Sequence, residues 1–432
     1  MAIERLIELE YEMQKCFRCN LCKMIPLPVV KNPDYFDVCP ANREYVFHSY
    51  SGSGKHIMAL ALVQDRIKAD EKLAAVTYAC TTCGACDVSC KYNMDAERHQ
   101  VNMALREHMV DVDLDPDVHR RTLENLKLYG HPDGKPIASP GEWSKDLGLK
   151  KLPEGKAQVL LFAGCLQRND SQSAETARKM ATLMRHAGVD FGILGDDELS
   201  CGLQAYWTGY RDFFRQNAGK VLSVLNKAGV KIIVAVSGSC LGAFRSKYPE
   251  YADAPQAKVL HATEFLWSLI KDKKLKLPGA VNRKVTYHYP CYLVRQSEPP
   301  VVWQGEKKTA LGVVDYYEPP KPVNMGTNGV FDAPREILKV VKGIKFIEMH
   351  RIREYSFCCG GGGGVPNAYP EMARSAALHR FEEASDVGAE YLVTACHQCR
   401  INLTRAGESA GKGATMPVID IIDIVYEAAK AK

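Results

Sequence analysis

The sequence predicts an α+β protein in which a helical N-terminal module precedes two repeated α/β domains. Three observations lead to this prediction. Eight of the 16 cysteines lie within the first 90 residues, in two closely spaced sets on either side of a segment with helical periodicity. Beyond residue 156, strand-like and helix-like patterns alternate, which is typical of α/β layering. This second part also repeats itself, with matching strands that end in cysteine.

Length and composition limit the class of protein. A chain of 432 residues is long enough for two or three domains, and its apolar content of 46% and charged content of 25% are ordinary for a soluble protein. The net charge of +5 is small and both signs are mixed along the chain, so we expect no nucleic-acid partner. The longest apolar runs, such as residues 232–236, are strand-sized, and no secretory signal is visible. We therefore expect a cytoplasmic protein with no membrane span of its own.

The cysteines of a cytoplasmic protein stay reduced, so their spacing is best explained as ligand spacing. A triplet at three-residue intervals is followed by Cys39 and a proline, and a second such triplet is followed by Cys90. Two-cluster bacterial ferredoxins have this spacing, and the last cysteine of each run binds the other cluster. We predict two cubane [4Fe–4S] clusters, one held by Cys16, Cys19, Cys22 and Cys90 and the other by Cys80, Cys83, Cys86 and Cys39. The alternative, two structural zinc sites, would use paired C-x-x-C knuckles and not triplets.

Module boundaries follow from changes in composition. Residues 1–110 form the predicted helical ferredoxin-like module, with a helical pattern at residues 56–76 between the cysteine sets. Residues 111–155 are rich in Asp, Pro and Gly turn signals and form a predicted linker. Residues 156–275 and 276–432 form the first and the second repeat.

The two repeats match in three places. The matching segments are residues 159–165 with 285–291, residues 200–202 with 358–360, and residues 237–240 with 396–399. The offset between the copies grows from 126 to 158 residues, which places an insertion of 32 residues in the second copy, at about residues 298–331. A long loop beside a site is often a lid or a docking surface, and a plain surface excursion is the alternative.

The copies differ in their cysteines. The second copy keeps five: Cys291, Cys358, Cys359, Cys396 and Cys399. In the first copy Ser200 and Ser237 replace two of them, which leaves Cys165, Cys201 and Cys240. Serine is a poor ligand for iron, so the first copy is either empty or holds something smaller, such as a zinc ion or a cubane with one non-cysteine ligand. We expect the chemistry in the second copy.

The strongest single signal is the stretch 355–400. Adjacent thiols at Cys358 and Cys359, five glycines from Gly360 to Gly364, and a C-x-x-C pair suit a many-atom iron–sulfur ligand better than a single ion. Glycines allow positive φ values and let backbone N–H groups approach inorganic sulfides. A flexible linker is the alternative, and the helical pattern that follows the glycines argues against it.

Together these motifs resemble the CCG-domain iron–sulfur oxidoreductases, and the module order resembles that of the D subunit of heterodisulfide reductase. The resemblance implies a noncubane four-iron cluster that acts on disulfides, with Cys358 and Cys359 as catalytic residues. Its implied ligands are Cys291, Cys358, Cys359, Cys396 and Cys399. The chain departs from the heterodisulfide reductase pattern in its degenerate first repeat and in its longer gap before Cys358, so relatives with one intact repeat look closer.

Three functions are consistent with this sequence. The first is an electron-transferring oxidoreductase subunit of a multiprotein complex in an anaerobe, in which the cubanes feed a noncubane cluster that acts on a thiol or disulfide. The second is a pure relay between other redox subunits, as in the class II benzoyl-CoA reductase complex. The third, the weakest, is a zinc-stabilised scaffold.

Four further residues lie close to the second-repeat cysteines in the sequence. His288 and His397 either donate protons to a leaving thiolate or pack at the edge of the cluster. Arg295 and Arg400 are expected to neutralise the negative charge of the cluster.

Overall fold

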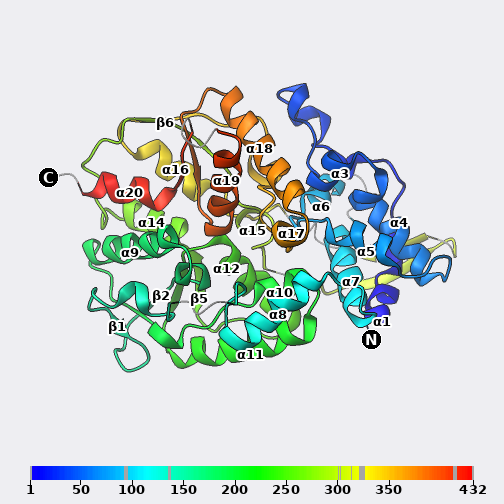
Figure 1. Cartoon of the computed structure of the whole chain (residues 1–432), viewed down its shortest axis with the longest axis horizontal. Coiled ribbons are helices and arrows are strands. Elements are labelled where there is room, and N and C mark those ends of the chain that lie inside the picture. Colours follow the sequence, from blue (N-terminus) through cyan, green and yellow to red (C-terminus); the bar gives the residue numbers. More distant parts are fainter. Residues whose placement is uncertain are drawn as a thin grey trace.

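The computed structural model describes residues 2–91, 96–134, 138–299, 301, 303–312, 314–320, 326–411 and 416–430. The N-terminal helices gather at one end of the molecule, and two α/β units fill the other end, where the C-terminus lies (Figure 1). This arrangement confirms the predicted α+β class with a helical module before two repeated α/β domains. The predicted boundaries of the domains stay predictions.

The N-terminal module contains short helices and turns around its cysteines. Its α-helices are α1 Ala2–Glu8, α2 Glu10–Gln14, α3 Pro40–Tyr45, α4 Gly52–Val63, α5 Glu71–Tyr78, α6 Ala85–Cys90 and α7 Arg98–Asp111. The helical pattern at residues 56–76 belongs to two helices, α4 and α5. The second of these begins where the Asp70 side chain accepts a hydrogen bond of 2.8 Å from the Leu73 N–H, as an N-cap does.

The first repeat is built on a parallel sheet. Its strands are β1 Lys150–Lys151, β2 Val159–Phe162, β3 Phe191–Ile193, β4 Ile232–Ala235 and β5 Lys258–His261, in the order β1-β3-β2-β4-β5. Its helices are α9 Ser171–His186, α10 Leu203–Thr208, α11 Arg211–Lys227, α12 Gly238–Gly242, α13 Tyr248–Tyr251 and α14 Ala262–Lys271. The segment predicted as a linker holds helix α8, Asp117–Tyr129, and strand β1 at the edge of this sheet.

The second repeat has a smaller parallel sheet with the same internal order. Its strands are β6 Arg283–Tyr287, β9 Ile344–Phe346, β10 Tyr391–Thr394 and β11 Val418–Asp420, in the order β11-β10-β6-β9. Its helices are α15 Cys291–Val294, α16 Asp332–Val340, α17 Val365–Ala368, α18 Pro370–Asp386, α19 His397–Ser409 and α20 Ile421–Ala429. Since β3-β2-β4-β5 corresponds to β9-β6-β10-β11, the internal repeat predicted from the cysteine-ended strands is confirmed.

Both repeats also end in the same way. A strand runs directly into a helix that begins with a capping box, at His261 and Glu264 in the first repeat and at Asp420 and Asp423 in the second. The reciprocal side-chain and backbone bonds satisfy N–H groups that the first turn of a helix leaves without partners.

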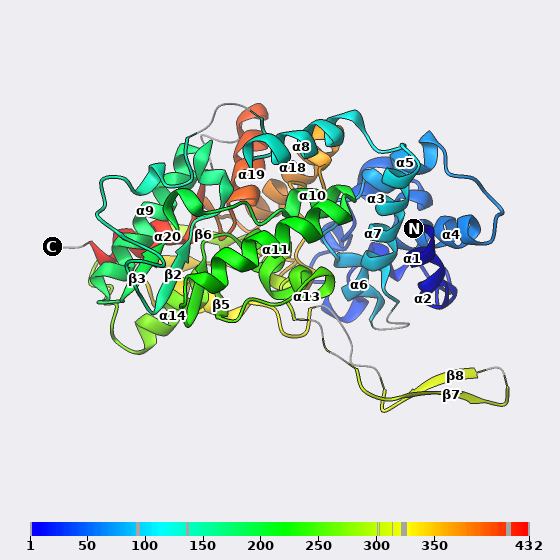
Figure 2. The ribbon, with the colours of Figure 1, turned by 90° about the horizontal axis from the view of Figure 1, so that it is seen from below.

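The insertion in the second repeat contains a hairpin that projects from the body of the molecule (Figure 2). Its antiparallel strands are β7 Glu306–Ala310 and β8 Val314–Glu318. The Tyr317 ring lies 6.1 Å from the Tyr11 ring of the N-terminal module. Parts of the predicted insertion, including residues 321–325, lie outside the described residues. Its role as a lid or docking surface stays a prediction.

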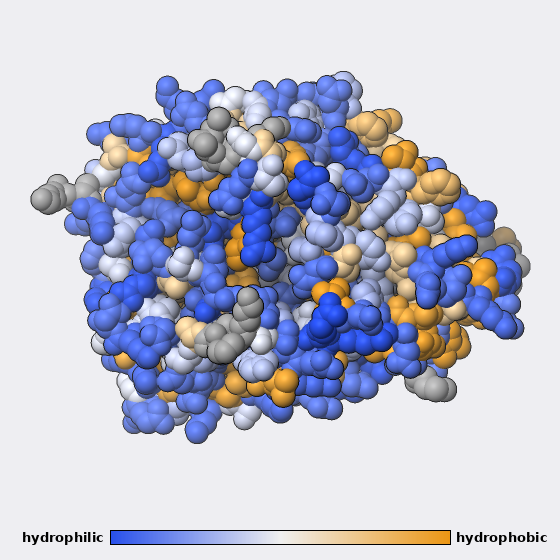
Figure 3. All heavy atoms as spheres, viewed as in Figure 1, coloured by the Kyte–Doolittle hydropathy of each residue, from blue (hydrophilic) through white to orange (hydrophobic). Residues whose placement is uncertain are grey.

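The face shown in Figure 3 is largely hydrophilic, with apolar side chains gathered toward the end that the N-terminal module occupies. Large apolar residues of this module are exposed, among them Phe17, Val46 and Phe47. Among the described helices, none has both the length and the apolar character that crossing a membrane requires.

Candidate metal centres

The second-repeat site lies at the carboxyl edge of its sheet. Cys291 begins α15 just beyond β6, and Cys396 is the N-cap of α19 just beyond β10. Because β6 and β10 are parallel neighbours, the residues that follow them meet at one edge. The loop before α17 adds Cys358 and Cys359, and all five thiols of the repeat are at most 7% exposed. The structure thus brings together all five cysteines predicted for this site.

The thiols of this site interact with one another. The sulfur atoms of Cys359 and Cys399 lie 3.3 Å apart, and Cys358 interacts with the thiols of Cys291 and Cys359. Hydrogen bonds from Cys358 and Cys399 hold the pKa of Cys359 well below its ordinary value despite burial. A thiolate is the form that binds metal, so Cys359 is prepared for ligation.

One further thiol comes from the N-terminal module. Cys83, a predicted cubane ligand, interacts with Cys358, and this contact together with burial raises the pKa of Cys83 well above its ordinary value. The same segment is held by Arg295, whose Nε donates a hydrogen bond of 2.8 Å to the Cys83 carbonyl oxygen. The second cysteine set and the second-repeat site are therefore adjacent.

The glycine run at residues 360–364 lets the second repeat pack closely against the second cysteine set of the N-terminal module. Gly363 has a φ of +68°, and a Cβ atom there would lie 2.5 Å from the Cys80 carbonyl oxygen. Backbone N–H groups of Gly360 and Gly361 lie 3.4 Å from the sulfur atoms of Cys358 and Cys359. The first two glycines thus approach cysteine sulfur atoms, whereas the later ones let the repeat pack against the N-terminal module. The expected approach of glycine N–H groups to inorganic sulfides stays a prediction.

A buried arginine joins all three parts of the chain. Arg106 of α7 is fully buried and donates hydrogen bonds to carbonyl oxygens of Tyr78 at 3.2 Å and of Gly363 at 2.7 Å, and also to that of Trp207 in the first repeat. Burial lowers the pKa of Arg106, although neighbouring Cys80 and Tyr78 oppose the effect. Its donors fix the N-terminal module against both repeats.

The two arginines predicted to neutralise charge have different roles. Arg295 is nearly fully buried beside Cys83 and Cys291, as expected for a residue that offsets thiolate charge. Arg400 instead pairs with Asp170 and bonds to Gln172 at the start of α9 in the first repeat. It therefore links the two repeats, and its charge is already compensated by Asp170.

His288 lies against the second-repeat thiols. One of its ring nitrogens is within 4.8 Å of the sulfur atoms of Cys359 and Cys399. Its Nδ1 accepts a hydrogen bond of 3.3 Å from Arg380, and its Nε2 has no partner among the described residues. Burial holds the pKa of His288 well below its ordinary value, so the ring is neutral. A buried imidazole beside thiols, with one nitrogen that has no partner among the described residues, is consistent with a site that accommodates a sulfur-rich group.

The second N-terminal cysteine set and three cysteines of the first set, Cys16, Cys22 and Cys90, are grouped in two different places. Cys39, Cys80, Cys83 and Cys86 line one cavity. Arg98 lies at the other set, where its Nη2 donates to Cys90 at 3.1 Å and its Nη1 to Cys16 at 3.5 Å. Burial opposes the charge of Arg98, but Cys22, Cys90 and Cys16 raise its pKa above the ordinary value. The predicted crossing of the fourth cysteines, Cys39 and Cys90, is compatible with both clusters of side chains.

The four thiols of the second set fit a cubane cluster, and the three grouped thiols of the first set fit one that Cys19 would complete. Cysteine thiolates are their usual ligands, and a guanidinium beside the thiolates compensates negative charge. No pattern in the sequence singled out Arg98 or Arg106, because their partners lie up to 257 residues away along the chain.

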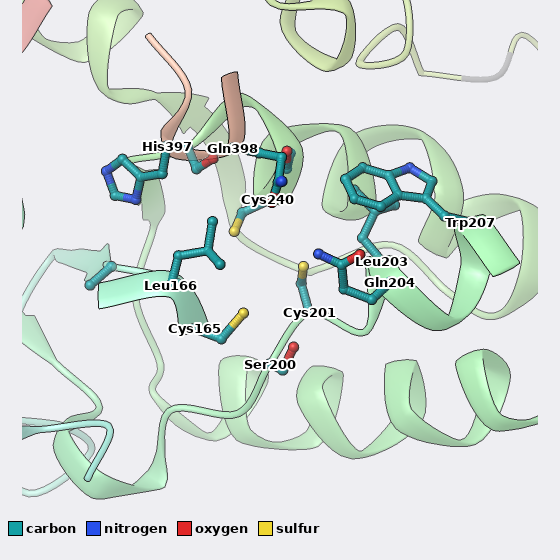
Figure 4. Close-up of a pocket in the computed structure, with 14 residues that line it drawn as sticks. Cys165, Leu166, Ser200, Cys201, Leu203, Gln204, Trp207, Cys240, His397 and Gln398 are labelled. Atoms are coloured by element: carbon teal, nitrogen blue, oxygen red, sulfur yellow. The ribbon is translucent and has the colours of Figure 1, made fainter. Parts of the chain in front are cut away.

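The first-repeat site is a smaller cup. The sulfur atoms of Cys165, Cys201 and Cys240 point toward one region, and Ser200, Gln204 and Leu166 surround it (Figure 4). The Cys201 and Cys240 thiols form a hydrogen bond that lowers the pKa of Cys201. His397 and Gln398 of the second repeat complete the lining of the cup. The His397 ring is directed away from the three sulfur atoms (Figure 4), and burial lowers its pKa to about 3.

Family models match both parts of the chain. The 4Fe-4S dicluster domain matches residues 12–94, and the cysteine-rich domain called CCG matches twice, at residues 159–245 and 323–404. These matches, the fold and the grouped thiols define an iron–sulfur protein of the electron-transferring oxidoreductase class. The chain contains one 4Fe-4S dicluster domain followed by two CCG cysteine-rich domains, as the sequence motifs had indicated.

Relatives agree with this assignment. The D subunit of the dihydromethanophenazine:CoB–CoM heterodisulfide reductase of Methanosarcina mazei is 28% identical over 428 residues, which cover 96% of this chain and 94% of that protein. The probable iron-sulfur-binding oxidoreductase FadF of Bacillus subtilis and the EtfAB:quinone oxidoreductase of Syntrophomonas wolfei are each 27% identical. They match 86% and 81% of this chain, which spans 50% and 46% of their own lengths.

Proposed function

We propose that this chain is a subunit of a redox complex that passes electrons from two N-terminal cubanes to a noncubane cluster in the second repeat. The order is the cluster of Cys16, then that of Cys80, then the second-repeat site. The observation that carries the proposal is the contact of Cys83 with Cys358, which joins the two thiol sets directly. The more exposed Cys16 set, with Cys19 at the surface, is then the exchange point with a partner.

The substrate class of the second-repeat site is a thiol or disulfide. Reduction of a disulfide consumes two electrons and two protons, breaks the S–S bond and yields two thiols, whereas iron–sulfur groups supply electrons one at a time. Cys291, Cys358, Cys359, Cys396 and Cys399 would hold the group, and Arg295 would offset its charge. The ligand set and the role of Cys358 and Cys359 in catalysis are part of this proposal.

A relay without its own substrate is the second candidate. The deep burial of all five second-repeat thiols favours it, because a substrate would need an opening to reach them. In that case electrons leave from the second-repeat site to another subunit. Under either function, the three thiols of the first cup suit a zinc ion or an incomplete cluster in a structural role.

Anaerobic iron and sulfide analysis with electron paramagnetic resonance tests the proposal on the whole chain. We expect two cubane signals and a third signal that changes when a thiol or a disulfide is added. A third signal that stays unchanged after a thiol and after a disulfide is added supports the relay function. Iron sufficient for two cubanes only, with no third signal in any redox state, contradicts both functions.

A further inference from the structure

The first repeat contacts the second-repeat site at one of its own lost ligand positions. Ser237 stands where the second repeat has Cys396, and the two residues lie 159 positions apart. The Ser237 Oγ atom is 3.5 Å from the Cys396 sulfur, and Ser239 Oγ is 3.4 Å from the same sulfur. Equivalent residues that meet one another are typical of a twofold relationship between copies. Ser237 therefore contacts Cys396, the residue at the equivalent position of the second repeat.

The Ser237 hydroxyl does not make the capping hydrogen bond that a serine at the start of a helix usually makes. Ser237 is the N-cap residue of α12, where serine normally accepts a hydrogen bond from a backbone N–H of the first turn. No such cap bond forms here. Its hydroxyl instead meets Cys396, and Ser237 is only 4% exposed.

Glycines bring α12 close enough for these contacts. A Cβ atom at Gly238 would lie 3.2 Å from the Leu293 Cβ, and one at Gly242 would lie 2.7 Å from the Tyr292 ring. Both neighbours belong to α15, the helix that begins with Cys291. Figure 4 shows Gln398 of the second repeat near Cys240, so the repeats also meet at the first-repeat cup. Small residues four positions apart thus let the two helices approach closely.

A hydroxyl group beside a thiolate has a defined direction of hydrogen bonding. A ligating Cys396 carries no proton, so Ser237 and Ser239 must donate to it. Hydrogen bonds to a ligating sulfur disperse its negative charge and stabilise the reduced form of a cluster, which raises the reduction potential.

We propose that the degenerate first repeat is a hydrogen-bond donor to the second-repeat cluster, with Ser237 and Ser239 as positioning residues that raise its reduction potential through Cys396. A serine at position 237 can donate a hydrogen bond to the Cys396 sulfur, whereas a ligating cysteine thiolate at that position could not. This inference rests on the proposed function, because it needs a cluster at Cys396.

A redox titration followed by electron paramagnetic resonance tests this inference on the whole chain. We expect Ser237→Ala and Ser239→Ala each to shift the potential of the third signal to a more negative value, and the double variant to shift it further. Both cubane potentials should stay unchanged. Ser200→Ala is the matched control, because it removes the other serine that stands at a lost ligand position, and it should leave the third potential unchanged.

The outcomes separate this inference from the proposed function. A wild-type chain without a third signal contradicts the proposed function and this inference with it. A third signal with an unshifted potential in the double variant overturns this inference alone. If the alanine variants lose the third cluster, Ser237→Thr and Ser239→Thr decide. Recovery of the signal and its potential by the retained hydroxyl supports donation, and failure to recover either overturns it.

Discussion

Arg295 Nε donates a hydrogen bond of 2.8 Å to the carbonyl oxygen of Cys83, and these two residues belong to different modules. The same guanidinium donates through Nη1 to Glu354 O at 2.7 Å and Ser356 O at 2.8 Å. One side chain therefore holds the Cys83 loop against the segment that leads to Cys358. The close approach of the two thiol sets depends on this buried cation.

Replacement of Arg295 should weaken the junction between these sites. Arg295→Met leaves two buried carbonyl groups and one partly buried carbonyl group without their donor, and each buried unpaired group costs about 1–3 kcal/mol. We expect a loss of about 3 kcal/mol or more, seen as a lower thermal midpoint of the anaerobic protein. Transfer of electrons from the cubanes to the second-repeat site should also slow in stopped-flow reduction.

Arg374→Met is the control for this prediction. Arg374 is half exposed and pairs with exposed Glu371 on α18. We expect a change within about 0.5 kcal/mol and unchanged transfer rates. Equal effects of the two replacements would contradict the role assigned to Arg295.

Gly363→Ala should separate the glycine run from the N-terminal module. The new Cβ would lie 2.5 Å from Cys80 O and 2.8 Å from the Thr81 carbonyl carbon, and backbone atoms cannot move aside cheaply. We expect loss of the cubane assigned to the Cys80 set, measured as iron content and signal intensity.

Gly411→Ala is the matched control, since Gly411 has the same φ of +68° with no atom within 4 Å. It should cost only about 1–2 kcal/mol of backbone strain. Full retention of both cubanes in Gly363→Ala would be evidence against the close packing.

The repeats and the thiol sets could be predicted from the sequence because they depend on local spacing. The strand that ends at Cys291 and the pair at Cys396 and Cys399 follow directly from periodicity and from the C-x-x-C interval. Parallel pairing of strands β6 and β10 then places these cysteines at one edge without any further information.

Contacts between modules could not be predicted in this way. The sequence indicates only that Ser237 is a lost ligand, whereas its contact with Cys396 depends on how the repeats face one another. Similarly, Arg106 has no acidic partner at helical spacing that would mark it, because its acceptors are backbone carbonyl groups of three distant segments. The ion pair of Arg400 with Asp170 of the other repeat could not be predicted either. Such partners are set by tertiary packing and not by local pattern.

The stability of the protein should fall in acid because of buried neutral histidines such as His261. Burial, with a contribution from Arg245, lowers the pKa of His261 to about 3, against about 6.5 in an unfolded chain. Below pH 6.5 the unfolded state binds a proton that the folded state does not, so stability is full above this pH and is lost as pH falls toward 3. This group alone contributes a loss of about 1.4 kcal/mol per pH unit in that window.

His261→Asn isolates this contribution, because asparagine can still cap α14 but does not titrate. Thermal midpoints of the wild type and the variant should converge, or cross, as pH falls from 7.5 to 5.5. A difference between the two proteins that stays constant over this range would contradict the assignment of a neutral His261.

Cys359→Ser should remove the third cluster and leave both cubanes in place. Cys359 is the thiol whose pKa is held well below its ordinary value by its cysteine neighbours, and serine binds iron poorly. We expect loss of the third paramagnetic signal and of its iron, with unchanged cubane signals. Cys201→Ser is the matched control, since Cys201 is the equivalent position of the first repeat and lies in the separate cup with Cys165 and Cys240. It should leave the third signal intact. Survival of that signal in Cys359→Ser, or its equal loss in both variants, would show that the cluster is not held by the second repeat.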